Sequence, residues 1–237
     1  MTQHLGDKMK KLPLMVPAHL NPHTMTKKEL IDYTTKYCKH GHRYSEHPNC
    51  FIEEQGRDLK IGYFDIETTG FEANYHCILT YCIKTRDKKE YYEGQITRED
   101  MLSGQFDKKV VQQLAKDMLK YDILIGYYST KFDVPFIRSR ALKNGVDFPV
   151  FGAVKHKDLY YMVKRLLKLH RNTLDAATNF LGIKGKNHVL GDIWMKARLG
   201  DTKSLRYVAK HNRLDCQITE KLHKKLEMYD KGLAKSI

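Results

Sequence analysis

The stretch Lys60-Ile-Gly-Tyr-Phe-Asp-Ile-Glu-Thr-Thr-Gly70 decides the fold that this sequence predicts. Its apolar residues predict a buried strand from about residue 61 to 67, which a polar turn closes. Because side chains alternate across a strand, Asp65 and Glu67 share one face of it. Neighbouring carboxylates at the end of an apolar strand repel each other, and a bound cation reverses that cost. Such oxygen ligands suit Mg²⁺ and Mn²⁺, whereas two solvated acids on an edge strand are the alternative.

The composition predicts a sizeable core and a polyanionic partner. The 237 residues are 41% hydrophobic and include 15 Tyr and 9 Phe, enough to pack one domain with a small appendage. The 42 Lys and Arg outnumber the 28 Asp and Glu, and the net charge of +14 favours nucleic acid as the partner. No apolar run is long enough for a membrane span or a signal peptide, so we expect a soluble, intracellular protein with no membrane partner.

Five side chains that can bind zinc crowd into one short stretch. They are Cys38, His40, His42, His47 and Cys50. Zinc takes four nitrogen or sulfur ligands in a tetrahedron, and short spacings let a single loop supply all of them. Cys38, His47 and Cys50 are the first choices, and either His40 or His42 completes the set. We therefore predict a structural zinc site, with a histidine-rich solvent loop as the alternative.

The remaining cysteines, Cys77, Cys82 and Cys216, have apolar neighbours and predict buried thiols. An odd total of five cysteines in a reducing compartment argues against a disulfide framework. The zinc prediction therefore rests on residues 38–50 alone.

The rest of the chain predicts a mixed α/β sheet flanked by helices. Residues 1–25 carry three prolines and predict an extended arm, and a capping box at 26–29 opens a short helix to about residue 37. Further strands are predicted at 75–85, 88–93, 122–126 and 155–157, and helices at 106–121, from 133 onwards, and at 159–169, 173–181, 193–199 and 205–228. This order is typical of a mixed sheet with helical layers.

Three other polar residues are candidates for the site. Asp133 is placed to cap a helix, with Pro135 tolerated in its first turn. His211 and Asp215 lie one turn apart and therefore share a helix face. Taken singly, each has a structural alternative, namely an N-cap for Asp133 and a surface hydrogen bond for the pair.

Basic residues gather in two nearby segments. They are Lys164, Arg165, Lys168, His170 and Arg171 in the first, and Lys184, Lys186 and His188 in the second. Such residues can follow a phosphate backbone, although a solvated basic face explains them as well.

Three motifs now stand in a fixed order along the chain. "FDIETTG" at 64–70, "YYSTKFDVPFIRSRA" at 127–141 and "HNRLDCQIT" at 211–219 resemble the three motifs of the DEDD superfamily of 3′–5′ exonucleases. Within it the chain is most similar to the proofreading domain of family B DNA polymerases and to stand-alone exonucleases predicted in bacteria and phages. The resemblance covers residues 58 to about 230. It implies a ribonuclease-H-like five-stranded sheet for 58–237, after an N-terminal arm, short helix and zinc-binding loop at 1–57.

The resemblance also implies the chemistry. Asp65, Glu67, Asp133 and Asp215 would hold two Mg²⁺ or Mn²⁺ ions about 4 Å apart and hydrolyse phosphodiester bonds. The family has tyrosine where this chain has His211, and an imidazole can take a proton from a water near neutral pH, so we expect His211 to be a general base or to orient the water.

Several residues are candidate substrate contacts by the same resemblance. They are Thr68, Thr69, Phe71 and Phe132, and Lys186 joins them because of its charge. Core packing is the alternative for both phenylalanines. A second departure from the family is Tyr128, where asparagine is usual, which leaves any substrate contact there open.

Together these features predict a stand-alone, metal-dependent 3′–5′ exonuclease that prefers single-stranded DNA to RNA. It would act in the cytoplasm of a bacterium, or of a phage-infected host, and a proofreading role would need a polymerase or another replication or repair protein as partner. The alternatives are an inactive nucleic-acid-binding module, since His211 replaces the usual tyrosine, and a structure-selective endonuclease on the same fold.

Overall fold

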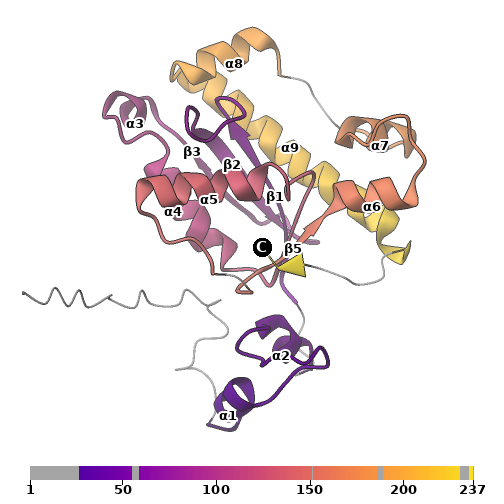
Figure 1. Ribbon diagram of the computed structural model, residues 1–237. Helices are drawn as coiled ribbons and strands as arrows, with labels where there is room; N and C mark the ends of the chain where they lie inside the picture. Colours follow the sequence, from indigo (N-terminus) through magenta and orange to yellow (C-terminus); the bar gives the residue numbers. More distant parts are fainter. Residues whose placement is uncertain (1–26, 55–58, 151, 186–188, 230–234, 237) are drawn as a thin grey trace, which may run out of the picture.

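A computed structural model describes residues 27–54, 59–150, 152–185, 189–229 and 235–236 of the chain (Figure 1). The strands are β1 Ile61–Thr68, β2 Ile78–Thr85, β3 Tyr91–Gln95, β4 Ile123–Gly126, β5 Lys155–Asp158 and β6 Lys235–Ser236. They form one sheet in the order β3-β2-β1-β4-β5-β6. Strands β1, β4 and β5 are parallel, whereas β2, β3 and β6 run antiparallel to their neighbours. The predicted five-stranded mixed sheet is therefore present, and the two-residue β6 extends its edge.

Nine helices lie in the described part of the chain. They are α1 Lys27–Thr35, α2 Pro48–Glu54, α3 Arg98–Leu102, α4 Lys108–Met118, α5 Asp133–Asn144, α6 Leu159–Leu166, α7 Leu174–Phe180, α8 Gly191–Arg198 and α9 Thr202–Leu226, which a 3₁₀ turn at Glu227–Tyr229 follows. None of them is both long enough and apolar enough to cross a lipid bilayer.

The sequence did not predict α2 or α3. Helix α2 begins at Pro48, and proline is favoured in the first turn of a helix, where its missing N–H is not needed. Helix α3 spans five residues, and its capping box pairs Thr97 with Asp100 rather than with the more common Glu or Gln. Both helices are too short for a periodic pattern to reveal them.

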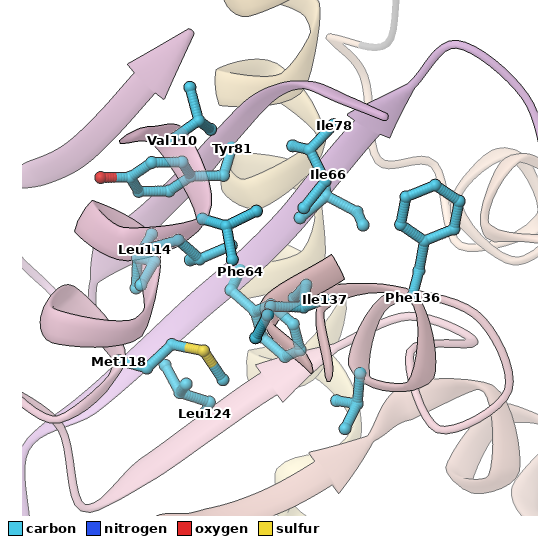
Figure 2. Close-up of a cluster of buried hydrophobic side chains, with 14 of the residues drawn as sticks. Phe64, Ile66, Ile78, Tyr81, Val110, Leu114, Met118, Leu124, Phe136 and Ile137 are labelled. Carbon is cyan, nitrogen blue, oxygen red and sulfur yellow. The ribbon is translucent and has the colours of Figure 1, made fainter. Parts of the chain in front are cut away.

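Strand β1 separates two hydrophobic cores. Phe64 and Ile66 belong to the first core, which lies under α4 and α5 (Figure 2). Tyr63 belongs to the second, which α6, α7 and the C-terminal half of α9 cover. The predicted alternation is thus present, and it leaves Asp65 and Glu67 on the face of Tyr63, towards α9.

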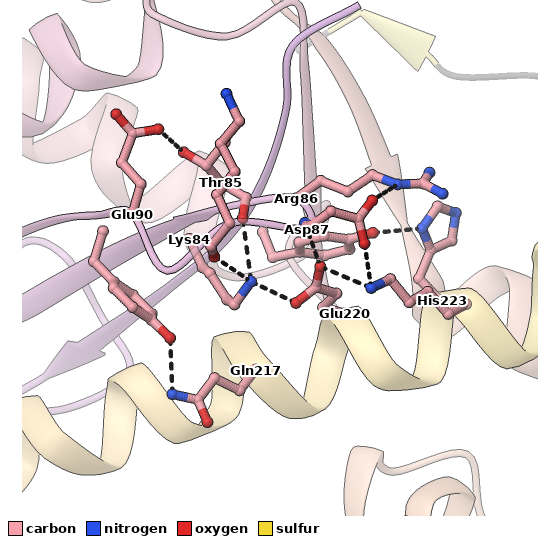
Figure 3. Close-up of polar contacts among 12 residues, drawn as sticks. Lys84, Thr85, Arg86, Asp87, Glu90, Gln217, Glu220 and His223 are labelled. Atoms are coloured by element: carbon pink, nitrogen blue, oxygen red, sulfur yellow. Dashed lines mark hydrogen bonds and ion pairs between the residues drawn. The ribbon is translucent and has the colours of Figure 1, made fainter.

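Helix α9 crosses the sheet and is anchored at the β2–β3 turn (Figure 3). Lys84 Nζ lies 2.5 Å from Glu220 Oε2, and both side chains are buried. Glu220 also accepts a hydrogen bond of 2.8 Å from the backbone N–H of Asp87, which has a positive φ of 58°. One turn further on, His223 Nδ1 is 2.9 Å from the hydroxyl oxygen of the buried Tyr63. These contacts fix the register of α9 against β1 and β2.

The N-terminal helices have a small core of their own. Its buried side chains are Tyr33, Cys38, Tyr44, Cys50 and Phe51. We call residues 27–54 the N-terminal module. It approaches the sheet domain closely at one glycine: a Cβ at Gly152, where φ is +86°, would lie 2.8 Å from the carbonyl oxygen of Glu46. The predicted boundary between 1–57 and 58–237 stays a prediction, and the predicted arm lies outside the described residues.

Candidate active site

The candidate acids converge at one end of β1. Asp65 and Glu67 lie near its carboxyl end, and Asp133 is the first residue of α5, which follows the parallel strand β4. Asp215 lies in the middle of α9, which packs against β1. Residues separated by as much as 150 positions in the sequence therefore meet where the sheet topology places ligand sites, beyond the carboxyl ends of parallel strands.

His211 lies between two of these carboxylates. Its Nε2 is 3.6 Å from Glu67 Oε1 and 3.6 Å from Asp215 Oδ2. One possible ligand atom from each of the three residues lies within 4.8 Å of the others. The predicted shared face of His211 and Asp215 is thus turned to the sheet, and both side chains are about 90% buried. A surface hydrogen bond does not describe this pair.

Asp133 plays a different structural role from the predicted helix cap. It is the first residue inside α5, where Phe132 is the N-cap residue and no side chain caps the helix. The buried Asp133 carboxylate instead accepts a hydrogen bond of 3.1 Å from the backbone N–H of Ile66, between the two acids of β1. This contact brings the third acid to the other two.

Asn212 is a residue of this site that we did not identify from the sequence. Its fully buried side chain donates from Nδ2 to the backbone oxygen of Asp65 at 3.2 Å and to Asp65 Oδ2 at 3.3 Å. Asparagine favours caps and turns over helix interiors, so its presence inside a long helix is a weak sign in the sequence that the side chain has a specific buried partner.

The electrostatics of the site favour a bound cation. Burial, together with the charges of Asp133, Glu67 and Asp215, raises the pKa of Asp65 well above its usual range. Burial raises the pKa of Asp133 to about 7, against the opposing effect of the N–H of Ile66. Carboxylate oxygens are the ligands that suit Mg²⁺ or Mn²⁺, and the charge of such a cation would stabilise the ionised acids.

The candidate substrate contacts lie in the adjoining turns. The hydroxyl of Thr68 donates to the carbonyl of Gly70 at 2.6 Å, and that of Thr69 accepts from the N–H of Cys77 at 3.0 Å. Phe71 is 82% exposed, so core packing is excluded for it, and its ring lies edge-on to the half-buried Phe132 at 6.1 Å. Lys186 lies outside the described residues.

A second cluster of potential ligands lies in the N-terminal module. Cys38, His40, His47 and Cys50 each place one ligand atom within 4.8 Å of the others. Four sulfur–nitrogen pairs among them are 3.4 to 3.9 Å apart. These separations match the edge of about 3.6 Å expected when Zn–S is about 2.3 Å and Zn–N about 2.0 to 2.1 Å in a tetrahedron. The cluster could therefore bind zinc.

His40 rather than His42 completes this cluster. His42 is exposed, and its ring lies 4.1 Å from that of His47. Burial beside His42 and His40 lowers the pKa of His47, which keeps the imidazole neutral, as zinc binding requires.

The comparisons with known proteins are consistent with this architecture. A family model described as the RNase_H superfamily matches residues 62–227. The DNA polymerase of Pyrococcus glycovorans is 23% identical over an alignment of 225 positions, which covers 82% of this chain and 28% of that polymerase. The DNA polymerase of Methanocaldococcus jannaschii is 26% identical over an alignment of 128 positions, which covers 45% of this chain and 7% of that polymerase.

A solved structure shares the fold. The family B DNA polymerase of the hyperthermophilic archaeon Pyrobaculum calidifontis aligns with a TM-score of 0.60 and 20% identity, over 72% of this chain and 25% of its own. The chain thus spans less than a third of the length of each of these three proteins.

Proposed function

The chain belongs to the RNase H superfamily, and from that premise we propose that it is a metal-dependent 3′–5′ exonuclease acting on single-stranded DNA. The family expected from the three motifs is confirmed, and its relatives support a nuclease-type function. The observation that carries the proposal is the meeting of Asp65, Glu67, Asp133 and Asp215 at the end of β1.

The four acids would hold two divalent cations, Mg²⁺ or Mn²⁺. When bound, such a pair supplies a nucleophile at neutral pH and stabilises the leaving 3′ oxygen. The chain's own contribution is to hold the carboxylates in place. Ile66 orients Asp133 through its backbone N–H, and Asn212 orients Asp65 through its side-chain amide.

His211 would act as the general base or orient the attacking water. Its Nε2 contacts Glu67 and Asp215, so a water beside these carboxylates is within its reach. Replacement His211→Tyr should preserve measurable cleavage and move the pH optimum upwards, because a phenol has a far higher pKa than an imidazole. An unchanged pH profile would remove His211 from the reaction.

Thr68, Thr69, Phe71 and Phe132 would contact the terminal nucleotide. The exposed Phe71 is the side chain best able to stack on a base. In the N-terminal module, Cys38, His40, His47 and Cys50 would hold a structural zinc ion, so residues 1–57 would form a unit separate from the nuclease domain at 58–237. A proofreading role would require a polymerase, or another replication or repair protein, on a separate chain.

The decisive experiment uses a single strand of DNA labelled at its 5′ end. We would incubate it with the protein, with and without Mn²⁺, beside Asp65→Ala and the control Asp147→Ala, which removes an exposed acid. We expect a metal-dependent ladder that shortens from the 3′ end with the wild type and the control, and an intact strand with Asp65→Ala.

Each other outcome points to a different function. Cleavage by Asp65→Ala would refute the active-site assignment. Internal cuts would favour an endonuclease, and binding without cleavage would favour a nucleic-acid-binding module. A matched RNA strand, run in parallel, compares the two substrates.

A further inference from the structure

Three parallel strands end at the same edge of the sheet, and each leads to a candidate contact surface. Strands β1, β4 and β5 pair in parallel, with Tyr63 opposite Ile125 and Gly126 opposite Asp158. The candidate acids lie at the end of β1. The turn at residues 127–132 follows β4, and helix α6 follows β5 directly. The acids, this turn and the start of α6 therefore lie in sequence along one edge.

Tyr128 has a strained backbone in this turn. Its φ is +60°, which is rare for a bulky residue, and its side chain is 46% exposed. The carboxylate of Asp158 maintains the conformation, because it accepts hydrogen bonds from the N–H groups of Tyr128 at 2.8 Å, Thr130 at 2.9 Å and Tyr160 at 2.9 Å. Strain of this kind, held by several contacts, is found at functional sites.

The result is a cluster of tyrosine rings at the edge of the sheet. The ring of Tyr128 lies edge-on to Tyr160 with centroids 4.9 Å apart, and Tyr160 lies 5.2 Å from Tyr161. Tyr161 is 41% exposed. The exposed rings of Tyr128 and Tyr161, joined through the half-buried Tyr160, give bases a surface on which to stack.

Cations continue the same face of α6. Tyr161, Lys164 and Arg165 are spaced i, i+3 and i+4, so they share one face of the helix, and all three are exposed. Lys168 follows at i+7, just beyond the helix. Residues 159–190 contain six Lys and Arg but a single acid, Asp175. We call Tyr128, Tyr160, Tyr161, Lys164 and Arg165 the aromatic–basic track.

We propose that the aromatic–basic track binds the single strand of nucleic acid that extends from the terminal nucleotide at the acid cluster. This inference rests on the proposed function, since it extends the same site. The path from the acids at the end of β1 to Arg165 would be about 19 Å long, from two strand spacings of about 4.8 Å each and about six residues of helical rise, which is enough for several nucleotides. Exposed rings favour a single strand, because the bases of a duplex are already stacked on each other.

Binding of two oligonucleotides tests the track without relying on cleavage. In the Asp65→Ala background, we would measure the anisotropy of a labelled 12-nucleotide oligothymidine, with an unlabelled thymidine dinucleotide, too short to reach α6 from the acids, as a competitor. The variants are Tyr161→Ala, Tyr161→Phe and the double variant Lys164→Glu/Arg165→Glu. The matched control is Lys108→Glu/Lys116→Glu, which reverses two exposed charges on α4, on the opposite face of the sheet.

We expect the track variants to lose affinity for the 12-mer and not for the short competitor. The Lys164→Glu/Arg165→Glu variant should bind the 12-mer at least about 10-fold more weakly and reduce the slope of log K against log salt by about 1.4, since two phosphate contacts are lost. Tyr161→Ala should lower the affinity for the 12-mer by about 10-fold, because stacking contributes about 1–3 kcal/mol per base. Tyr161→Phe keeps the ring and should therefore bind the 12-mer as the parent protein does. Affinity for the dinucleotide competitor should change less than about twofold.

Two results would overturn the inference. One is unchanged 12-mer binding in the track variants, and the other is an equal loss in the α4 control. The outcomes for the track and for the proposed function are separable. If the protein does not cleave DNA but the track variants bind the 12-mer more weakly, the inference about the track is supported and the proposed function is not. If the protein cleaves DNA and the track variants bind the 12-mer normally, only the inference about the track is wrong.

Discussion

The N-terminal module and the sheet domain both gather potential metal ligands, but they do so in opposite ways. In the module, Cys38, His40, His47 and Cys50 come from one short stretch and offer sulfur and nitrogen. In the domain, the acids come from residues 65 to 215 and offer mainly oxygen. The module buries five hydrophobic side chains in its own cluster, whereas two much larger cores support the domain.

The difference shows what a metal can do in each region. A core as small as that of the module cannot stabilise a fold alone, so zinc would have to supply the folding free energy. The domain is large enough to fold around a group of acids that repel one another, and a cation would then bind to a site that already exists. Four predictions test this contrast.

The largest effect should come from His40→Ala. Losing one of four zinc ligands should remove most of the apparent 10–16 kcal/mol that zinc contributes to small metal-dependent folds, so α1 and α2 should unfold. Hydrogen exchange should show peptides from 27–54 unprotected while β1 stays protected, and mass spectrometry should show no zinc.

His42→Ala is the matched control for that experiment, since His42 is exposed beside the cluster. It should retain one zinc ion and full protection. If α1 and α2 remain protected in His40→Ala, zinc does not determine the fold of the module, and the contrast between the two regions is wrong.

The second prediction concerns the stability of the domain at low pH, and the expected effect is smaller. Burial lowers the pKa of His156 to about 4, and its Nε2 lies 2.8 Å from Ser129 Oγ. Between pH 6.5 and 4 the unfolded chain therefore binds a proton that the folded chain excludes, so the domain should lose about 3 kcal/mol of stability as the pH falls through this range. Urea unfolding at pH 7 and pH 4, followed by the fluorescence of Trp194, measures it.

His156→Gln should remove most of this loss in the domain. The module should still release zinc at low pH, because its histidines and cysteines must be deprotonated to bind the metal. An equal acid loss in wild type and His156→Gln would show that another group controls the acid stability of the domain.

The third prediction has the opposite sign from the first. Because the pKa of Asp65 is raised in the folded protein, its ionisation makes the metal-free domain less stable as the pH rises from about 4. Asp65→Asn should therefore stabilise the domain by about 1–3 kcal/mol at pH 8 without added Mg²⁺ or Mn²⁺, and should respond less to Mn²⁺ than the wild type. Urea unfolding with and without Mn²⁺ checks both effects. A destabilised Asp65→Asn would mean that this acid supports the fold, as the ligands of the module are expected to do.

The smallest effect should follow from Asn212→Ala. The two hydrogen bonds from Asn212 to Asp65 orient the carboxylate, and loss of such a partner weakens metal affinity by about 10- to 100-fold. Calorimetric titration with Mn²⁺ measures the change, and the zinc content should stay at one ion per chain. An unchanged Mn²⁺ affinity would make Asn212 a packing residue only.

How far the sequence could predict the molecule depended on where each residue's partner lies. The alternation of β1 and the shared face of His211 and Asp215 depend on spacing within one element, and both are present. The role of Asn212 depends on a partner 147 positions away, which no local pattern reveals. The local alternative for Asp133, a helix N-cap, is wrong for the same reason, because its partner is the backbone of β1.

Within residues 38–50 the sequence left open whether His40 or His42 completes the set of candidate zinc ligands. The backbone decides between them. Gly41 has a φ of +78° and turns the chain, and the N–H of Cys38 bonds to the carbonyl of His42 at 2.8 Å. This hairpin places His40 Nδ1 3.7 Å from Cys38 Sγ and 3.4 Å from Cys50 Sγ, whereas the ring of His42 lies beside that of His47. Spacing alone treats the two histidines alike, because they stand on either side of the same glycine.

Helix α9 makes two sets of contacts, and a fixed number of residues lies between them. His211 and Asp215 meet Glu67 at the end of β1, and Glu220 meets Lys84 at the β2–β3 turn. Each residue of a helix adds about 100° of rotation, so one insertion or deletion between Asp215 and Glu220 would turn one set away from its partners. In evolutionary terms the length of this segment is fixed, and its sequence is constrained as well, because Cys216, Ile218 and Thr219 within it are buried.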